Sequence, residues 1–154
     1  MGQEVRTCVL LDTETTGLDH TKDEIIELGM VKFDYTTDGR IVGLRDTLSA
    51  FNEPSAPISA EVTALTGITD AMVAGQRFDD SAITAFADDA VIVIAHNSAF
   101  DRKFAERYRP VFEHKAWACS MSEIDWAQAR IRRRAVGLPA ERCRLLPPRA
   151  PHRR

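Results

Sequence analysis

Residues 5–18 read VRTCVLLDTETTGL, an apolar run that ends in acids, small hydroxyls and a glycine. The run Val5–Leu11 predicts a buried β-strand. Side chains two positions apart on an extended backbone face the same way, so Asp12 and Glu14 are expected side by side at the end of this strand. Carboxylates this close repel each other. A divalent cation such as Mg²⁺ or Mn²⁺, which prefers carboxylate oxygens and water, removes the conflict.

An Asp-x-Glu pair alone says little, because a chain with this many acids contains about one by chance. A solvated acidic loop is therefore the alternative interpretation. The surroundings favour a site: a predicted buried strand precedes the pair, and Thr15-Thr16-Gly17-Leu18 follows it. Small hydroxyl side chains and a glycine allow the backbone to approach a polar ligand closely.

A second polar cluster follows the apolar run Ala90–Ala95, which is typical of a buried parallel strand. The chain continues as His96–Asp101, and Asp101 falls in the first turn of an expected helix. Favourable interaction with the helix dipole is the alternative role of this acid. If the two strands are parallel neighbours, their carboxyl ends meet, and Asp101 joins Asp12 and Glu14.

The remaining pattern indicates an α/β domain with a mixed sheet, because antiparallel strands come first and helices then alternate with strands. Asp38-Gly39 is a hairpin signal between the second and third strands. The expected strands are Val5–Leu11, Ile25–Tyr35, Ile41–Leu48, Ala90–Ala95 and Ala116–Ser120. The expected helices run from Ser59 to Gly67, over Phe78–Asp88, from Ser98 to about Tyr108 and over Ser122–Ala129.

The composition is that of a globular protein, with 44% hydrophobic and 28% charged residues over 154 positions. The longest apolar run is far below the roughly 18 residues of a membrane span, and the N-terminus does not resemble a signal peptide. The three cysteines, Cys8, Cys119 and Cys143, are widely spaced. A disulfide framework or zinc site is therefore not expected, and a reducing cytoplasm fits.

The formal charge of −3 hides an uneven distribution. Residues 1–129 hold 11 Lys and Arg against 22 Asp and Glu, a net charge of −11. Residues 130–154 hold nine Arg and one Glu, a net charge of +8. An acidic body followed by a basic, proline-containing segment predicts two units with different origins or roles.

Four stretches together resemble the DnaQ-like 3′–5′ exonucleases, the DEDD family of the histidine-base subtype, which includes the proofreading epsilon subunit of bacterial DNA polymerase III. Asp12–Leu18 is similar to the first exonuclease motif and His96–Asp101 to the second. Residues 24–29, EIIELG, resemble the second strand of the family, and residues 64–69, ALTGIT, its wedge segment. The resemblance implies a ribonuclease-H-like fold: a mixed five-stranded sheet flanked by helices, here C-terminally incomplete.

The resemblance further implies hydrolysis of DNA 3′ ends, single-stranded or frayed, with release of nucleoside monophosphates and with two Mg²⁺ or Mn²⁺ ions about 3.5–4 Å apart. Asp12 would bridge both cations, Glu14 would bind the one that activates water, and Asp101 would hold the other. These three are the predicted catalytic and metal-binding residues. The predicted substrate-binding residues are Thr15, Thr16, Gly17, Leu18, Leu65, Thr66, Asn97 and Phe100. DNA polymerase subunits are candidate partners in replication and repair, and no membrane association is expected.

Several of these residues have a structural alternative. Leu18, Leu65 and Phe100 could equally be core residues, and Asn97 could cap the following helix. His96 is interpreted as a structural residue at the strand end rather than the catalytic base. His20 and His114 are expected in solvent.

The family pattern also requires a general-base His followed five positions later by a fourth metal-binding Asp. No such pair follows Asp101: His114 is followed by Cys119 at that distance, and the last Asp is Asp125. Losing a general base typically slows a reaction about 10²–10⁴-fold, so impaired activity is expected. A non-catalytic metal- or nucleic-acid-binding pseudo-exonuclease is the alternative function, and an interaction subunit is a third.

We therefore interpret residues 1–129 as a truncated exonuclease-like domain, and residues 130–154 as an arginine- and proline-rich tail that is disordered or read out of frame. Arg, Pro, Ala and Leu in excess with no Lys is what a GC-rich coding sequence gives in a wrong frame. An arginine-rich arm that binds nucleic acid is a second hypothesis. An ordinary structural ending is a third.

Overall fold

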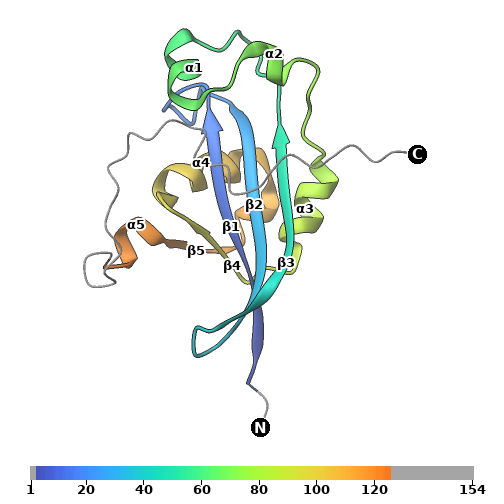
Figure 1. Cartoon of the computed structure of the whole chain (residues 1–154), viewed down its shortest axis with the longest axis vertical. Helices are drawn as coiled ribbons and strands as arrows, with labels where there is room; N and C mark the ends of the chain where they lie inside the picture. Colours follow the sequence, from blue (N-terminus) through green and yellow to red (C-terminus); the bar gives the residue numbers. More distant parts are fainter. Residues whose placement is uncertain (1–2, 126–154) are drawn as a thin grey trace.

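The structure is a computed structural model, and it describes residues 3–125. The predicted boundary at residue 129, the tail 130–154 and the end of the helix expected over Ser122–Ala129 lie outside these residues. Five strands form one mixed sheet in the order β3-β2-β1-β4-β5, flanked by helices (Figure 1). The predicted fold class is confirmed in this part of the chain.

The first three strands form the expected antiparallel meander: β1 covers Val5–Thr15, β2 Ile25–Thr36 and β3 Ile41–Phe51. Gly39 adopts a φ of +86° in the turn between β2 and β3, which explains the Asp-Gly signal. The prediction that the first strand ends at Leu11 was wrong. Pairing with β2 continues as far as Thr15 opposite Ile25, so the Asp-x-Glu pair lies inside the strand rather than after it.

The two later strands, β4 (Ile92–Ala95) and β5 (Ala116–Cys119), are both parallel to their neighbours. Cys8 pairs with Ile92, and Leu10 with Ile94. The expected adjacency of the first strand and the apolar strand is therefore confirmed. A site is expected at the point where their carboxyl ends meet.

Three helices lie where the sequence predicts them: α1 covers Ala60–Thr66, α3 Asp80–Asp88 and α4 Ser98–Tyr108. The helix expected to start at Ser122 is wrong in its bounds, because α5 covers Ser120–Glu123 and Ile124 after it is extended. Ser59 caps α1 by accepting a hydrogen bond from the Val62 amide at 3.2 Å, and Gly67 ends the helix with a φ of +76°. The N-cap of α4 is Asn97 rather than Ser98, and its side chain makes no capping hydrogen bond. Two short elements were not predicted, α2 (Asp70–Val73) and the 3₁₀ helix η1 (Pro110–Phe112).

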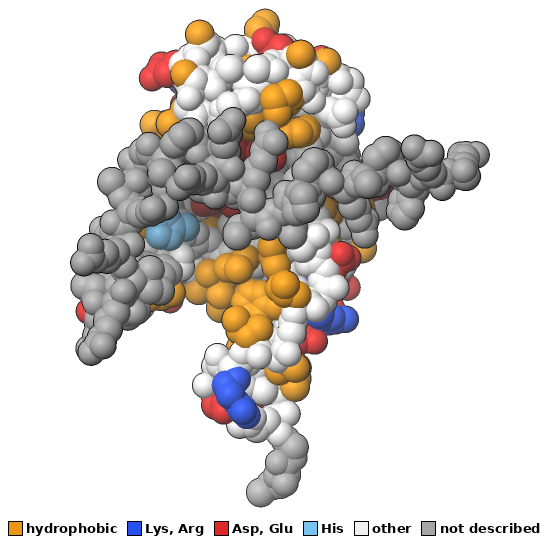
Figure 2. All heavy atoms as spheres, in the orientation of Figure 1, with side chains coloured by type: hydrophobic (Ala, Val, Ile, Leu, Met, Phe, Trp, Pro, Cys, Tyr) orange, Lys and Arg blue, Asp and Glu red, His pale blue; other side chains and the backbone are white. Residues whose placement is uncertain are grey.

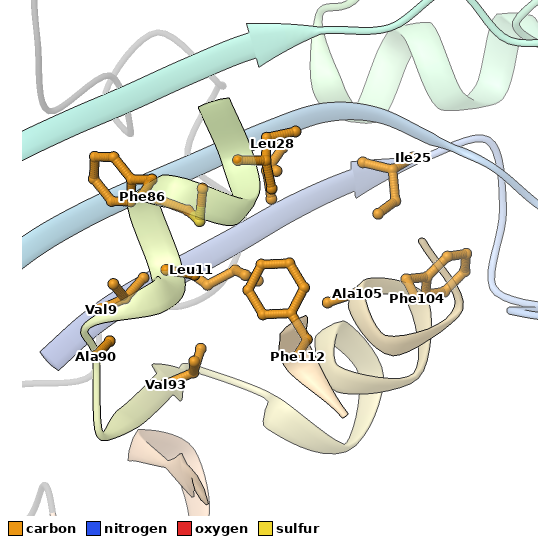
Figure 3. Packing of buried hydrophobic residues seen from close by; sticks show 13 residues of the cluster. Val9, Leu11, Ile25, Leu28, Phe86, Ala90, Val93, Phe104, Ala105 and Phe112 are labelled. Carbon is orange, nitrogen blue, oxygen red and sulfur yellow. The ribbon is translucent and has the colours of Figure 1, made fainter. Parts of the chain in front are cut away.

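The main core lies between one face of the sheet and helices α3 and α4 (Figure 3). Val9 and Leu11 of β1 alternate with outward residues and pack with Phe86 and Phe104 of these helices. A smaller cluster, Ile26, Ile58, Ile68 and Val73, anchors α1 and α2 beside β2.

The other face of the sheet carries exposed apolar side chains in the described part of the chain. Leu10 is 42% exposed, and Ile41 and Leu44 of β3 are 69% and 74% exposed. Figure 2 shows hydrophobic side chains gathered over the strands on this face. None of the helices within residues 3–125 is long and apolar enough to cross a membrane.

Candidate active site

The end of β1 presents its two acids on the face of the sheet opposite the core. Thr13 and Thr15 are buried on the core side, while Asp12 is exposed and Glu14 half-buried on the other. This alternation confirms that the Asp-x-Glu pair projects from one face. A bulge between Glu14 and Thr15 shifts the pairing with β2, a distortion that re-aims side chains.

The third predicted acid, Asp101, is held at the same end of the sheet by the first turn of α4. It is 4% exposed, and its Oδ1 atom accepts hydrogen bonds from the Thr13 amide at 3.1 Å and the Thr13 hydroxyl at 2.8 Å. Because Thr13 lies between the two acids of β1 in sequence, Asp101 is fixed directly behind them. The helix-dipole role fits its position in the first turn, but the contact to β1 shows a more specific placement.

The electrostatics of these acids are unfavourable in the protein alone. Burial raises the pKa of Glu14 to about 7, with further contributions from Asp12, Glu27 and Asp101. Burial also raises the pKa of Asp101 to about 6, and Asp12 adds to the shift against the hydrogen bonds from Thr13. The pKa of Asp12 is raised as well, because the surrounding protein desolvates it even though one side is open to solvent; the Thr13 backbone hydrogen bond and His96 partly oppose this.

The basic side chains that the structure describes do not pair with these acids. Among residues 3–125, no Lys or Arg forms an ion pair with Asp12, Glu14 or Asp101. A bound divalent cation would stabilise the charged form of each carboxylate. The donor chemistry therefore suits Mg²⁺ or Mn²⁺.

The described residues do not form a complete metal cage. No three His, Cys, Asp or Glu side chains in residues 3–125 converge as a ready ligand set. One Asp101 oxygen is engaged by Thr13 instead. Mg²⁺ usually binds through one or two carboxylates, several waters and substrate phosphates rather than in an all-protein cage. The carboxylates thus fit a cation that is held jointly with a phosphate-bearing ligand.

Hydrogen bonds among its own polar groups stabilise the loop after β1. The Thr15 hydroxyl donates to the Gly17 carbonyl at 2.6 Å, and the Thr16 hydroxyl accepts from the Glu24 amide at 3.0 Å and donates to Asp23 at 3.3 Å. A Cβ atom at Gly17 would lie 2.5 Å from the Asp23 carboxylate, so a larger residue would displace the Asp23 side chain that accepts from Thr16 and from the Asp19 amide. The predicted substrate role of these residues remains a prediction, and the structure adds a role in shaping the loop.

The three apolar residues predicted to contact substrate lie in different surroundings. Leu18 is 84% exposed and Leu65 is 79% exposed, which rules out the core alternative for both. Phe100 is partly buried against the main core and stacks 4.9 Å from Phe104. Exposed leucines near an acidic site are available to an apolar ligand group such as a base or sugar.

A cavity of about 240 Å³ lies between the loop after β1 and helix α4. Leu18, Asn97 and Phe100 share this cavity, which brings three predicted substrate residues to one place. Its walls are Leu18, His20, Asn97, Ala99, Phe100, Lys103 and Phe104.

The other predicted residues make mainly structural contacts. Thr66 donates to the Val62 carbonyl at 2.8 Å and accepts from the Ile68 amide at 3.1 Å, at the end of α1, which lies beyond the carboxyl end of β1 (Figure 1). His96 is exposed, and its Nδ1 atom lies 3.1 Å from the Ser120 hydroxyl, which fits the structural interpretation of this residue.

Sequence reasoning missed several residues at this end of the sheet. Glu27 pairs with Glu14 across β1 and β2, and the antiparallel register would have been the signal for it. Thr13 was passed over because its partner Asp101 is 88 positions away. His20 is less exposed than expected: it is half-buried, with its ring edge-on to Phe104 at 6.4 Å between centroids, whereas His114 is exposed as predicted.

Comparison with known proteins gives a consistent result. The RNase_T model, described as exonuclease, matches residues 9–135. PolC-type DNA polymerase III of Thermotoga petrophila is 37% identical over 125 residues, which cover 80% of this chain and 8% of the relative. The Clostridium perfringens protein of the same name is 40% identical over 101 residues, 64% of this chain and 7% of the relative. The chain thus spans less than a tenth of the length of these polymerases.

Solved structures agree. Exonuclease X in complex with 5′ overhanging duplex DNA is 30% identical with a TM-score of 0.51, covering 74% of this chain and 60% of that one. Escherichia coli Exonuclease I in complex with an oligonucleotide has a TM-score of 0.57 at 15% identity, covering 74% of this chain and 28% of that one. At that identity the second likeness concerns the fold alone.

Proposed function

Because the chain belongs to the exonuclease family that the RNase_T model describes, we propose that it is a metal-dependent 3′–5′ exonuclease that acts on DNA 3′ ends and releases nucleoside monophosphates. One observation carries this proposal: three acids from β1 and α4 lie at the same end of two adjacent parallel strands, close enough for Asp12 to raise the pKa of the other two, and without Lys or Arg partners in the described residues. The DNA in the Exonuclease X complex supports DNA as the substrate. The PolC-type relatives support association with DNA polymerase subunits in proofreading.

Asp12, Glu14 and Asp101 would hold two divalent cations, with Asp12 shared between them. When bound, such cations supply an activated water and neutralise charge on the scissile phosphate. The raised pKa values of Glu14 and Asp101 mean that cation binding must displace protons near neutral pH. The hydrogen bonds from Thr13 keep Asp101 oriented while it does so.

The neighbouring residues would position the strand. Leu18 and Phe100 offer apolar surface to the terminal base or sugar, and Asn97 offers an amide in the same cavity. Leu65 is exposed on α1 and would contact the terminal nucleotide from another side. The hydrogen bond from the Thr15 hydroxyl to the Gly17 carbonyl orders the backbone of residues 15–17, which suits a role in contacting the nucleotide.

We further propose that the activity is impaired. No His followed five positions later by Asp is present after Asp101, so a general base and a fourth cation ligand of the family pattern are missing from this chain. The same observation favours a second candidate, a non-catalytic pseudo-exonuclease that binds metal or nucleic acid. We assign residues 1–129 to the exonuclease-like domain and residues 130–154 to a tail read out of frame. Translating the other two frames past codon 129 tests this, and finding no His-x4-Asp there would count against it.

The test of function is digestion of a 5′-labelled single-stranded DNA by the full chain with Mn²⁺. We expect shortening from the 3′ end, release of nucleoside monophosphates, and loss of both in Asp12→Ala. Asp46→Ala, which removes an exposed acid on β3, is the matched control and should retain the activity. If Asp12→Ala releases mononucleotides as fast as the wild type does, the site assignment is wrong. No release, combined with Mn²⁺ binding that Asp12→Ala abolishes, would support the pseudo-exonuclease.

A further inference from the structure

Lys103 differs from every other basic residue that the structure describes. Residues 3–125 contain eleven Lys and Arg, and ten of them form an ion pair or donate a hydrogen bond to a backbone carbonyl. Within this part of the chain, Lys103 alone has neither. The ten engaged residues are Arg6, Lys22, Lys32, Arg40, Arg45, Arg77, Arg102, Arg107, Arg109 and Lys115.

The uncompensated cation lies beside the proposed substrate site. Lys103 is exposed, and it lines the 240 Å³ cavity together with Leu18, Asn97 and Phe100. Its neighbour Arg102 is instead held by Glu106, with 2.6 Å between the guanidinium and the carboxylate. A charged group that the fold leaves without a partner beside a candidate site is available to a ligand of opposite charge.

Several contacts hold helix α4, which carries Lys103, to the loop after β1. One turn further along α4, Arg107 donates to the carbonyl oxygens of His20 at 2.5 Å and Asp23 at 2.9 Å. The His20 ring also packs edge-on to Phe104. These contacts fasten the loop after β1 to α4, so the two sides of the cavity keep a fixed spacing. Lys103 therefore projects from a rigid element, which suits a binding residue.

Helix geometry separates Lys103 from the carboxylates. Residues two positions apart on an α-helix point about 200° apart around its axis. Asp101 faces inward to Thr13 and is 4% exposed, so Lys103 faces outward on the opposite side of α4. A phosphate held at the three acids is therefore out of the direction in which Lys103 points, whereas Lys103 can reach a phosphate of a strand that extends across the cavity it lines.

We propose that Lys103 binds a backbone phosphate of the DNA strand other than the scissile one and so anchors the strand across the cavity. This inference rests on the proposed function. The body of the chain has a net charge of −11 over residues 1–129, so a polyanionic ligand needs a local positive contact. The Lys ammonium binds phosphate as a compact point charge. Lys103 is thus a strand-binding residue, separate from the cation ligands.

The test measures binding of the full chain to a short labelled single-stranded DNA by fluorescence anisotropy over a range of salt concentrations. Ca²⁺ replaces Mn²⁺ so that binding is followed without hydrolysis. We expect Lys103→Gln to weaken binding about two- to fivefold, the range for one exposed ion pair. The slope of log affinity against log salt should fall by about 0.7, the value for one phosphate contact to a single strand. Lys103→Arg should restore the slope.

Arg102→Gln is the matched control, because it removes one positive charge from the adjacent position of α4 while its partner is Glu106. It should leave the salt slope unchanged. Competition by thymidine 5′-monophosphate, which carries a single phosphate, should be the same for wild type and Lys103→Gln.

The outcomes separate the inference from the function on which it rests. If the wild type binds no oligonucleotide, the proposed function itself fails. If the wild type binds and Lys103→Gln matches Arg102→Gln in affinity and slope, the role of Lys103 is overturned while the function stands. A mononucleotide affinity that falls as much as the oligonucleotide affinity would place Lys103 at the scissile phosphate and also overturn the proposal.

Discussion

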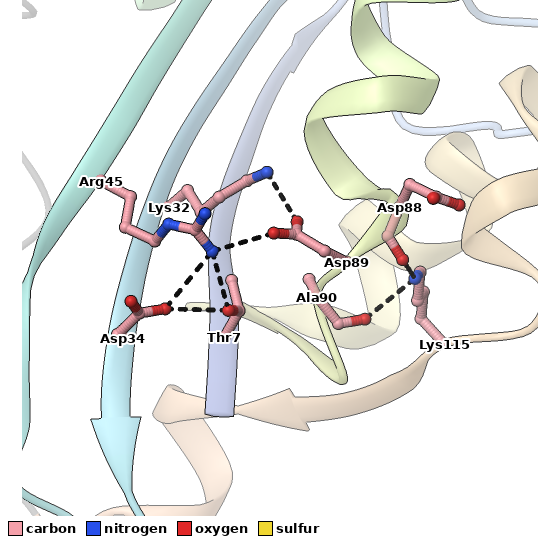
Figure 4. Close-up of polar contacts among 8 residues, drawn as sticks. All are labelled: Thr7, Lys32, Asp34, Arg45, Asp88, Asp89, Ala90 and Lys115. Carbon is pink, nitrogen blue, oxygen red and sulfur yellow. Dashed lines mark hydrogen bonds and ion pairs between the residues drawn. The ribbon is translucent and has the colours of Figure 1, made fainter. Parts of the chain in front are cut away.

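The two ends of the sheet differ in whether their acidic side chains form ion pairs with Lys or Arg. At the start of β1, Lys32 contacts Asp89 at 2.7 Å, and Arg45 contacts Asp89 at 2.9 Å and Asp34 at 3.6 Å (Figure 4). At the other end of the same strand, three acids lie near each other without a Lys or Arg ion pair in residues 3–125.

The contrast shows in the direction of the pKa shifts. The hydrogen bond from Lys32 lowers the pKa of Asp89, against a small effect of burial. Burial and neighbouring acids raise the pKa of Glu14 to about 7. One sheet thus has an end whose acids pair with Lys and Arg and an end whose acids have no such pair within residues 3–125. This difference, more than the acids themselves, marks the second end as the functional one.

The largest expected effect comes from introducing a Lys side chain beside the proposed cation ligands. Glu27 lies opposite Glu14 in the β1–β2 register, so Glu27→Lys places an ammonium beside the proposed cation ligands. We expect Mn²⁺ affinity to fall about 10–100-fold, the range for changes next to metal ligands. Calorimetric titration of the full chain measures it. Glu27→Gln, which removes a charge without adding one, should cause a smaller loss. An unchanged affinity in Glu27→Lys would show that Glu14 does not bind the metal.

A second change removes the carboxylate of an ion pair at the other end of the sheet. Asp89→Ala leaves Lys32, whose side chain is only 11% exposed, without its carboxylate partner, while Arg45 keeps Asp34. Breaking such a pair should lower the free energy of unfolding by about 1–3 kcal/mol, less than for a fully buried pair because Asp89 is 45% exposed. Urea denaturation measures the change. The exposed Asp46→Ala should stay within about 0.5 kcal/mol of wild type. A similar result for both variants would mean that the ion pairs of Asp89 add no stability.

Local patterns in the sequence were sufficient to predict the sheet and to indicate that Asp101 lies at the same end of it as Asp12 and Glu14. The meander follows from three apolar runs and an Asp-Gly turn, and the parallel pairing of β1 and β4 follows from a continuous apolar run before Asn97. Both signals lie within a few residues of the element that they specify. This is why the fold class could be predicted without coordinates, whereas the position of Asp101 also depended on the assumption that the two strands are parallel neighbours.

Features that depend on distant partners could not be predicted in this way. β1 continues to Thr15 because β2 pairs with it there, although the apolar run that predicts the strand ends at Leu11. The packing of His20 against Phe104 depends on Arg107, which fastens the loop from α4. That Lys103 has no ion-pair partner emerges only after each of the other ten Lys and Arg side chains within residues 3–125 has been assigned a partner.

A smaller effect is expected from the hydrogen bond that orients Asp101. Thr13→Val keeps the shape of the buried side chain and removes the hydroxyl that donates to Asp101 at 2.8 Å, while the Thr13 amide still donates at 3.1 Å. The free energy of unfolding should fall by about 0.5–1.5 kcal/mol. Urea denaturation again provides the measurement. Thr47→Val, at an exposed position of β3, is the control and should change little. Equal effects at the two positions would contradict a specific role of the Thr13 hydroxyl.

The smallest effect concerns the slope of stability with pH in the absence of metal. The pKa of Glu14 rises from 4.5 to about 7 on folding, and that of Asp101 from 3.8 to about 6. The folded chain therefore binds more protons than the unfolded chain between about pH 4 and 7. These two groups then make the free energy of unfolding fall as pH rises through that window. The pKa of Asp89 is lowered, so its contribution is lost only below about pH 4 and adds no slope in this window.

Glu14→Gln isolates this effect, because every other titrating group is common to both proteins. Urea unfolding at several values between pH 5 and 8 with EDTA should show stability falling with pH more steeply in wild type than in Glu14→Gln, by less than one proton. Saturating Mn²⁺ should oppose the fall in wild type, because the cation binds the deprotonated carboxylates of the folded chain. Identical slopes for the two proteins in EDTA would mean that folding does not raise the pKa of Glu14. The end of the sheet that holds Glu14 would then not differ from the end that holds Asp89 in its need for a cation.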